Sequence, residues 1–171
     1  MKKITFILGG ARSGKSSYVL ELARKYKKVA FIATCQALDK EMAKRIKLHK
    51  ESRPKDWDTF EEPKEIEATL KKLTNKYDCI VIDCLTLLVS NLFLSGLNKK
   101  TIEEKISKLI AALKKVNCRV MLVSNEVGMG IVPDNKMARD FRDVAGRANQ
   151  IIAAQANEVF FMMAGLPLKI K

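Results

Sequence analysis

A glycine-rich segment near the N-terminus has the residue types and spacing of a phosphate-binding loop. Gly9 and Gly14 enclose four residues, and Lys15 and Ser16 follow, which fits the pattern G-x-x-x-x-G-K-[ST]. In such a loop, backbone N–H groups and the positive end of a helix dipole bind phosphate. The lysine reaches the β- and γ-phosphates, and the serine hydroxyl binds Mg²⁺. A ligand-free turn is the alternative, but the apolar run before the loop and the amphipathic run after it favour nucleotide binding.

Two further polar positions follow apolar runs farther along the chain. Asp83 ends the run 79–82, which is the arrangement expected of a Walker B acid that holds Mg²⁺ opposite Ser16. The alternative is an aspartate that only ends a strand. Asn125 and Glu126 follow the next apolar run and would supply a second polar group or an ordinary loop carboxylate.

His49 is the only histidine of the chain, so any imidazole chemistry depends on it. It continues the spacing of Met42 and Ile46 along one predicted helix, where a lone histidine is more often structural. The cationic neighbours Arg45, Lys50 and Arg53 favour a neutral imidazole and attract phosphate. Since a neutral imidazole is a nucleophile, covalent phosphate chemistry is the competing interpretation.

Apolar runs predict the elements that must position these residues. Buried strands are expected at 4–8, 29–33, 79–83, 119–124 and 158–163, with a short alternating strand at 57–61. Helices are expected at 16–26, 40–51, 63–74, 85–94, 102–115 and 136–156. Asp39 is the predicted N-cap of the second helix, and Thr101, with Glu104 at capping-box spacing, that of the fifth. Residues 85–94 are apolar nearly all round, so this helix is predicted to be buried or at an interface.

The alternation of strands and helices predicts an α/β fold with a mainly parallel sheet, helices on both faces and an antiparallel edge strand within residues 164–170. Right-handed crossovers bring the carboxyl ends of the parallel strands to one edge, where such sheets bind ligands. At 171 residues the chain is expected to form a single domain, 1–171.

Composition narrows the class of protein. The sequence has no run of about eighteen apolar residues, so no membrane span is predicted. Residues 1–3 are expected to lead directly into a strand and not to begin a signal peptide. The four cysteines form no CxxC pair and read as small buried hydrophobes in a reducing compartment, except Cys35 at a strand end. A cytoplasmic enzyme without membrane insertion is expected.

The net charge of +13 raises the possibility of nucleic-acid binding, but its distribution argues against this interpretation. Residues 118–171 carry seven Lys or Arg against five Asp or Glu, and the excess elsewhere is mostly Lys alternating with Glu on helix faces. No aromatic residues are interleaved for base stacking. A solvated Lys/Glu surface is therefore favoured.

Five segments together resemble the bifunctional adenosylcobinamide kinase / adenosylcobinamide-phosphate guanylyltransferase family of cobalamin biosynthesis. They are residues 9–16, 32–35, 39–46 with His49 and Lys50, 125–133 (NEVGMGIVP) and 139–150 (RDFRDVAGRANQ). The phosphate-binding loop is common to many families, whereas the last two segments are more specific. The resemblance implies a P-loop, RecA-like fold and a homotrimer.

The resemblance also implies the chemistry. A nucleoside triphosphate, ATP or GTP, phosphorylates adenosylcobinamide, and GMP from GTP is then transferred to the resulting phosphate through a guanylyl-histidine at His49. His49 and Lys15 are the implied catalytic residues, and Ser16 and Asp83 the implied Mg²⁺ ligands. The implied nucleotide-binding residues are Gly9, Gly10, Ala11, Arg12, Ser13, Gly14, Lys15, Ser16, Ala33, Thr34, Cys35, Lys50, Glu51, Ser52, Arg53, Glu61 and Asp83. Asp83 and Cys35 depart from the Glu and Ser of other members.

Two alternatives stay open on the sequence. A P-loop small-molecule kinase would use ATP and leave His49 structural. A RecA-like nucleic-acid-dependent ATPase would bind DNA in a salt-sensitive way.

Overall fold

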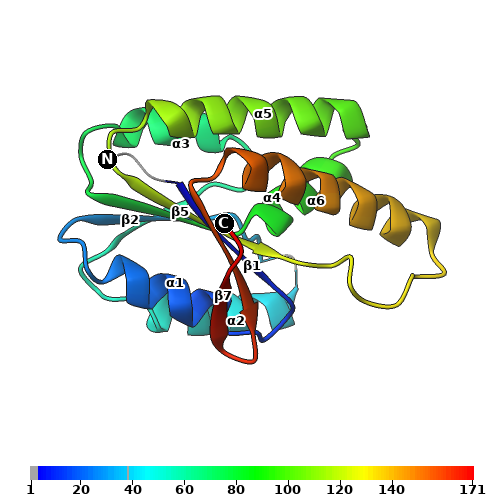
Figure 1. The fold of residues 1–171 in the computed structure, drawn as a ribbon, viewed down its shortest axis with the longest axis horizontal. Helices are drawn as coiled ribbons and strands as arrows, with labels where there is room; N and C mark the ends of the chain where they lie inside the picture. Colours follow the sequence, from blue (N-terminus) through cyan, green and yellow to red (C-terminus); the bar gives the residue numbers. More distant parts are fainter. Residues whose placement is uncertain (1–3, 38) are drawn as a thin grey trace.

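The chain folds around one seven-stranded sheet with helices on both faces (Figure 1). A computed structural model describes residues 4–37 and 39–171, apart from the side chain of Arg45. The strand order is β3-β2-β4-β5-β1-β6-β7, and every pairing is parallel except that of β6 with β7. The predicted α/β class, with its antiparallel C-terminal edge strand, is confirmed.

Each element lies close to its predicted position. The strands are β1 (Ile4–Gly9), β2 (Val29–Ala33), β3 (Asp58–Glu61), β4 (Cys79–Asp83), β5 (Arg119–Asn125), β6 (Glu158–Met163) and β7 (Leu166–Lys169). The helices are α1 (Lys15–Ala23), α2 (Lys40–Glu51), α3 (Ile66–Leu73), α4 (Leu85–Leu94), α5 (Lys99–Lys115) and α6 (Lys136–Gln155).

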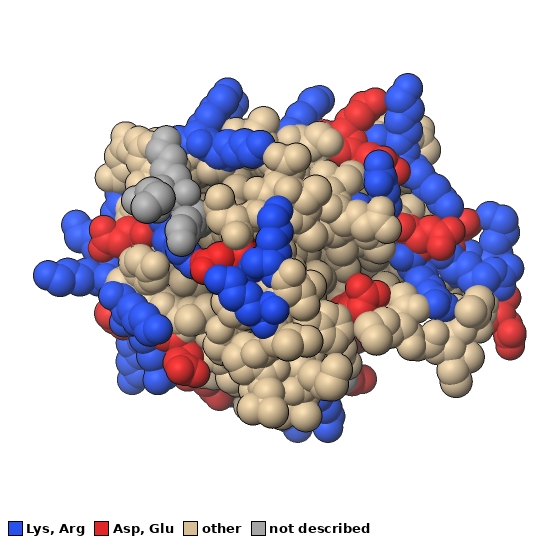
Figure 2. Space-filling model, viewed as in Figure 1, with Lys and Arg blue, Asp and Glu red and all other residues tan. Residues whose placement is uncertain are grey.

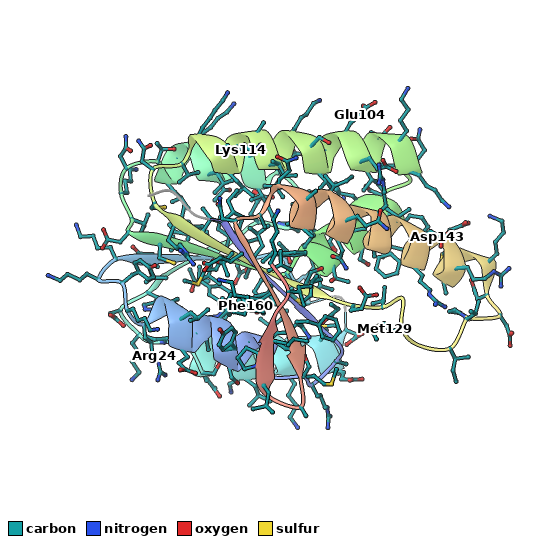
Figure 3. All side chains as sticks on the ribbon, viewed as in Figure 1. Arg24, Glu104, Lys114, Met129, Asp143 and Phe160 are labelled. Carbon is teal, nitrogen blue, oxygen red and sulfur yellow. The ribbon has the colours of Figure 1, made fainter. Side chains whose placement is uncertain are left out.

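The central strands are continuous apolar runs because both of their faces are covered. One face packs against α3 to α6, and its core includes Phe6, Ile80 and Ile106. The other face packs against α1, with Val19 and Phe31 in its core. Figure 3 shows side chains filling both spaces between the sheet and the helices. Burying one such side chain contributes roughly 1.5–3 kcal/mol, which fixes the sheet that carries the site.

Helix starts account for most of the errors in the predicted boundaries. Thr101 is not the N-cap of α5: the helix begins at Lys99, and the side chain of Asn98 accepts a hydrogen bond from Thr101 N at 2.9 Å. α3 begins at Ile66 rather than at residue 63, because the Glu62 carboxylate accepts hydrogen bonds from Lys64 N and Glu65 N and holds them in a turn. The Asp39 cap is confirmed by a 2.7 Å hydrogen bond from Met42 N.

The first helix and the third strand are also shorter than predicted. α1 ends at Ala23, and Tyr26 N then bonds back to Ala23 O at 3.0 Å, which tightens the chain into a turn before residue 26. β3 begins at Asp58, so only residues 58–61 pair with β2, while Trp57 packs into the core beside Val19.

The apolar helix α4 is buried within the chain. Six of its residues are buried, and it packs against β5, α5 and α6. Leu94, its last residue, is exposed, and further exposed large apolar side chains lie at Met129, Ile131 and Val132 between β5 and α6. A trimer interface is therefore not needed to cover α4.

The surface charges, the helices and two of the cysteines bear on the class of protein. Figure 2 shows Lys and Arg interspersed with Asp and Glu on the visible face. Among the described residues, no helix has both the length and the apolar character that a membrane crossing requires. Burial raises the pKa of Cys79 and that of Cys84 to about 12, so both thiols stay protonated, as expected of buried structural cysteines.

Candidate functional site

The predicted phosphate-binding loop connects β1 to α1 at the carboxyl edge of the sheet. Gly9 has φ 155°, and a Cβ there would lie 2.6 Å from both Met162 O and Ser13 Oγ. Gly14 has φ 94°, and its Cβ would lie 3.1 Å from Gly165 Cα. A side chain at either position would thus meet both a clash and backbone strain. The spacing of the two glycines therefore reflects the shape of this loop.

The loop presents positive charge to a ligand. α1 begins at Lys15 with Gly14 as its N-cap, and no side chain caps the first-turn N–H groups, which leaves them for an anion. The buried Lys15 ammonium donates hydrogen bonds to Gly10 O at 2.5 Å and Ser13 Oγ at 3.4 Å. Burial lowers the pKa of Lys15, and interactions with Cys84 and Asp83 oppose this shift. The ammonium thus lies inside the loop rather than on its outer surface.

Asp83 lies opposite the loop, as predicted. Its Oδ2 accepts a hydrogen bond from Ser16 Oγ at 3.4 Å. Burial raises the pKa of the Asp83 carboxyl, while His49, Arg53, Ser16 and Lys15 act to lower it. Its surroundings are therefore cationic, and its hydrogen bond with Ser16 is long.

The Ser16 and Asp83 oxygens are ligands of the kind that Mg²⁺ prefers. Among the described residues, no group of three or more His, Cys, Asp or Glu side chains could hold a metal ion. Two protein oxygens fit a Mg²⁺ that takes most of its other ligands from phosphates and water, as in nucleotide sites.

The C-terminal end of α2 brings His49 to the same place. His49 lines a narrow cleft with Ser16, Arg53 and Asp83, and Leu20, Phe31 and Ser52 complete its walls. Ser52 Oγ donates a hydrogen bond to His49 O at 2.9 Å, which holds the chain as it leaves the helix. The imidazole, the loop hydroxyl and the carboxylate therefore share one cleft, although they come from distant parts of the chain.

Arg53 is the most informative residue of this cleft. Its guanidinium carbon lies 3.8 Å from the centroid of the Phe31 ring, and its Nε and Nη1 atoms are buried without a hydrogen-bond partner among the described residues. Burial lowers the pKa of Arg53, while Asp83 and Glu61 act to raise it. A half-buried cation with unused donors is able to bind an anion such as phosphate.

Four other predicted nucleotide-binding residues, Lys50, Glu51, Glu61 and Thr34, are not among the residues that line this cleft. Lys50 forms an ion pair with Glu61 across from α2 to β3. Glu51 instead faces Lys47 one turn back on the same helix, at 3.9 Å. Thr34 is fully buried, and its hydroxyl is engaged with the backbone of Cys84.

The remaining predicted residues lie at the end of β2 and on the phosphate-binding loop. Cys35 is half-buried just past the end of β2, and burial raises the pKa of its thiol, with Asp83 adding to the shift. Ala33 ends β2 beside Asp83, while Ala11 and Arg12 are exposed on the loop.

Three contributors were not predicted from the sequence. Phe31 reads as an ordinary strand residue, yet its ring supports Arg53. Gly165, at the β6–β7 turn, donates a backbone hydrogen bond to Ser13 O at 3.1 Å and so contacts the loop. Asn91 bonds to two chain segments of the site, and its only signal in the sequence is an amide within an apolar helix.

Comparisons with known proteins point to one family. The family model described as "Cobinamide kinase / cobinamide phosphate guanyltransferase" matches residues 5–170. The chain is 43% identical to the bifunctional adenosylcobalamin biosynthesis protein CobU of Salmonella typhimurium, over 96% of this chain and 98% of that protein. It is 42% identical to the bifunctional protein CobP of Pseudomonas aeruginosa, over 96% and 95% of the two chains.

Solved structures support the fold class. A KaiC-like protein from Pyrococcus horikoshii OT3 superposes with a TM-score of 0.53 at 14% identity, over 93% of this chain and 70% of that chain. The RadB recombinase superposes with a TM-score of 0.54 at 15% identity, over 93% and 73%. At such low identity the likeness concerns the P-loop, RecA-like fold alone.

Proposed function

Because the chain belongs to the cobinamide kinase / cobinamide phosphate guanyltransferase family, we propose that it phosphorylates adenosylcobinamide and then guanylylates the product to give adenosylcobinamide-GDP. The observation that carries this proposal is the cleft in which His49 lies with Ser16, Arg53 and Asp83. An imidazole beside a phosphate-binding loop supports a role for His49 as the nucleophile. A kinase alone has no need of that imidazole.

In the first reaction, the hydroxyl oxygen of adenosylcobinamide attacks the γ-phosphorus of a nucleoside triphosphate. The bond between the γ-phosphorus and the β–γ bridging oxygen breaks, a nucleoside diphosphate leaves, and the hydroxyl proton is released. Lys15 and the N–H groups at the start of α1 hold the phosphates and stabilise the charge on the departing oxygen.

In the second reaction, an imidazole nitrogen of His49 attacks the α-phosphorus of GTP. The bond to the α–β bridging oxygen breaks, pyrophosphate leaves, and the imidazole loses a proton as the P–N bond forms. An oxygen of adenosylcobinamide phosphate then attacks the same phosphorus, the P–N bond breaks, and His49 recovers a proton. Arg53, with its unused donors, is placed to bind a phosphate oxygen during both exchanges.

We further propose Mg²⁺ as the cofactor, held by Ser16 and Asp83, where it would supply positive charge to the phosphate oxygens of ATP or GTP. A cytoplasmic location is supported by four free cysteines, which suit a reducing compartment. A homotrimer is proposed from the resemblance, and the exposed apolar residues between β5 and α6 support an interface there.

The guanylyl-histidine provides the test. The protein is incubated with Mg²⁺ and GTP labelled at the α-phosphorus, and the labelled peptide is identified by mass spectrometry. We expect one adduct, at His49, that is labile in acid and stable in base, as a phosphoramidate should be. The variant His49→Ala should lose it, whereas Lys44→Ala, at an exposed position of the same helix, should label like the wild type.

Full labelling of His49→Ala would contradict the assignment of the nucleophile. An unlabelled wild-type protein that still phosphorylates adenosylcobinamide would point to the simple kinase. The nucleic-acid-dependent ATPase has no support from the family match, and the likeness to RadB concerns the fold alone.

A further inference from the structure

Asn91 is a buried amide on the core-facing side of α4, and it is not among the residues that line the cleft at His49. It is 8% exposed, and its immediate neighbours in the helix, Leu88, Val89 and Leu92, are buried apolar residues. A polar group in this position is retained only if its hydrogen bonds are satisfied.

Both hydrogens of the Asn91 amide are used, and each reaches a different segment of the chain. Asn91 Nδ2 donates to Thr34 O at 2.9 Å and to Pro63 O at 3.0 Å. Thr34 follows β2, and Pro63 lies two residues beyond the end of β3. A single side chain therefore joins the carboxyl ends of two neighbouring strands.

The segment at Thr34 is also joined to the end of β4. Thr34 N donates to Asp83 O at 3.1 Å, and the Thr34 hydroxyl donates to Cys84 O and accepts from Cys84 N, both at 2.8 Å. Fixing Thr34 thus fixes the backbone that carries the Asp83 carboxylate.

The segment at Pro63 leads toward His49. Glu62 N donates to Ala33 O at 2.9 Å, and the adjacent Glu61 forms the ion pair with Lys50, the residue after His49. A shift of the β3 end would therefore move Glu61 and, through its ion pair with Lys50, displace the C-terminal turn of α2, where the imidazole lies.

We propose that Asn91 is a positioning residue for the guanylyl-transfer site, which it serves by holding the ends of β2 and β3 at a fixed separation. The inference rests on the proposed function, which makes the Asp83 and His49 sides of the cleft two halves of one nucleotide site. The proposal assigns this role to the two N–H donors of Asn91 and not to the apolar packing of α4.

The chemistry of the amide allows a graded test. Asn91→Ser keeps at most one donor, Asn91→Ala has none, and Asn91→Asp, when ionised, presents acceptors to two carbonyl oxygens. Leu92→Ala is the matched control, because it removes a buried side chain from the next position of the same helix and leaves both hydrogen bonds in place.

The GTP concentration at which labelling of His49 is half-maximal is measured in single turnover for each variant, below its melting temperature. We expect it to rise roughly ten- to a hundredfold in Asn91→Ala, less in Asn91→Ser and more in Asn91→Asp, with a smaller change in the maximal rate. Leu92→Ala should match the wild type despite its lower stability. Hydrogen exchange should increase at residues 33–37 and 61–65 in the Asn91 variants and not in Leu92→Ala.

The same rise in Leu92→Ala would overturn the proposal, because the effect would then follow stability alone. An unchanged half-maximal concentration in Asn91→Ala would overturn it as well. If Asn91→Ala does not fold, Asn91→Ser carries the comparison with Leu92→Ala. Failure of the proposed function would be distinct, since the wild-type protein itself would then not be labelled.

Discussion

The guanidinium of Arg53 lies in surroundings that would be unfavourable unless an anion binds there. Phe31 covers one face of the guanidinium, and two of its nitrogens are buried without partners among the described residues. Burying a cation in this way opposes folding, and its attraction to Asp83 and Glu61 offsets only part of that penalty. A bound phosphate would supply the missing acceptors, so we expect Arg53 to raise the affinity for GTP and to lower the stability of the free protein.

Replacing Arg53 by Met should therefore separate stability from binding. Met keeps an unbranched apolar stem beside Phe31 but has neither charge nor donors, so the free energy of unfolding should stay level or rise. The dissociation constant for GTP should increase roughly ten- to a hundredfold, because a hydrogen bond to a charged group contributes about 1.5–3 kcal/mol. Chemical denaturation and calorimetric titration measure the two quantities.

Arg24→Met is the control for this substitution, because Arg24 is exposed at the C-terminal end of α1, the end opposite to the loop. It should change neither quantity appreciably. Unaltered GTP affinity in Arg53→Met would show that its free donors serve no ligand.

At the scale of elements, the phosphate-binding loop is braced by the turn between β6 and β7. Ala164 and Gly165 form this turn with φ 51° and 84°, and Gly165 N reaches Ser13 O at 3.1 Å. The close approach of Gly165 Cα keeps position 14 small, because a Cβ on Gly14 would lie 3.1 Å from it. The C-terminal hairpin is thus part of the site, although none of its side chains reaches the cleft.

A pair of glycines tests this brace. Gly165 and Gly96 have nearly equal φ angles, 84° and 85°, and a Cβ at either would meet no atom within 4 Å. Alanine at either position should lower the free energy of unfolding by a similar amount, about 1–2 kcal/mol, through backbone strain alone. Only Gly165→Ala should also weaken GTP binding, by about fivefold, because relief of the strain moves the turn away from Ser13.

Urea denaturation and calorimetric titration of both variants provide the readouts. Equal GTP affinity in the two variants would mean that the loop keeps its shape without the hairpin.

The elements also show what a sequence can and cannot predict. Strands β1, β2, β4 and β5 were predicted to within a residue, because burial on both faces requires an uninterrupted apolar run. The start of α5 was wrong because Asn98 and Thr101 are both good capping residues, and local sequence does not decide between them. The loop residues were found through their spacing.

The roles of Phe31 and Asn91 were not predicted, because they depend on neighbours brought close only by the fold. The same limit applies to the hydroxyl of Thr34, because its hydrogen bonds with the backbone of Cys84 join two strand ends that are distant in the sequence. Spacing in the sequence identifies groups that act together within one loop. It does not identify groups from different elements that meet in the core.

At the scale of the whole molecule, one segment extends beyond the packed sheet and helices. The loop between β5 and α6 and the first turns of α6 project at one side of the fold, and Met129 lies on this loop (Figures 1 and 3). Met129, Ile131 and Val132 are 77%, 96% and 61% exposed, and Met137 adds a further exposed apolar side chain. Neighbouring apolar side chains of this kind mark an interaction surface more often than a solvated one.

The segment is nonetheless well anchored to its own chain, which suits an interface. Arg142 donates a hydrogen bond to Gly128 O, Gly128 N donates to Glu126 Oε1 at 2.6 Å, and Glu126 N donates to Gly9 O at 2.9 Å. The base of the loop is therefore bonded directly to the first glycine of the phosphate-binding loop. The apolar tip lies only a few residues along the chain from Glu126. A subunit packed on this tip would therefore be linked to the nucleotide site through the loop.

The proposed trimer should depend on this apolar tip. In a ring of three, one contact repeats three times, so a substitution at the tip acts on every interface at once. Burying one large apolar side chain contributes roughly 1.5–3 kcal/mol, and Ile131→Asp would replace that contribution with the desolvation of a charge. We expect this variant to be monomeric in light scattering after size exclusion, with an unchanged melting profile of the monomer because the Ile131 side chain is almost fully exposed.

Leu168→Asp, an equally drastic change at an exposed position of β7, is the control and should remain trimeric. A trimeric Ile131→Asp would place the interface elsewhere.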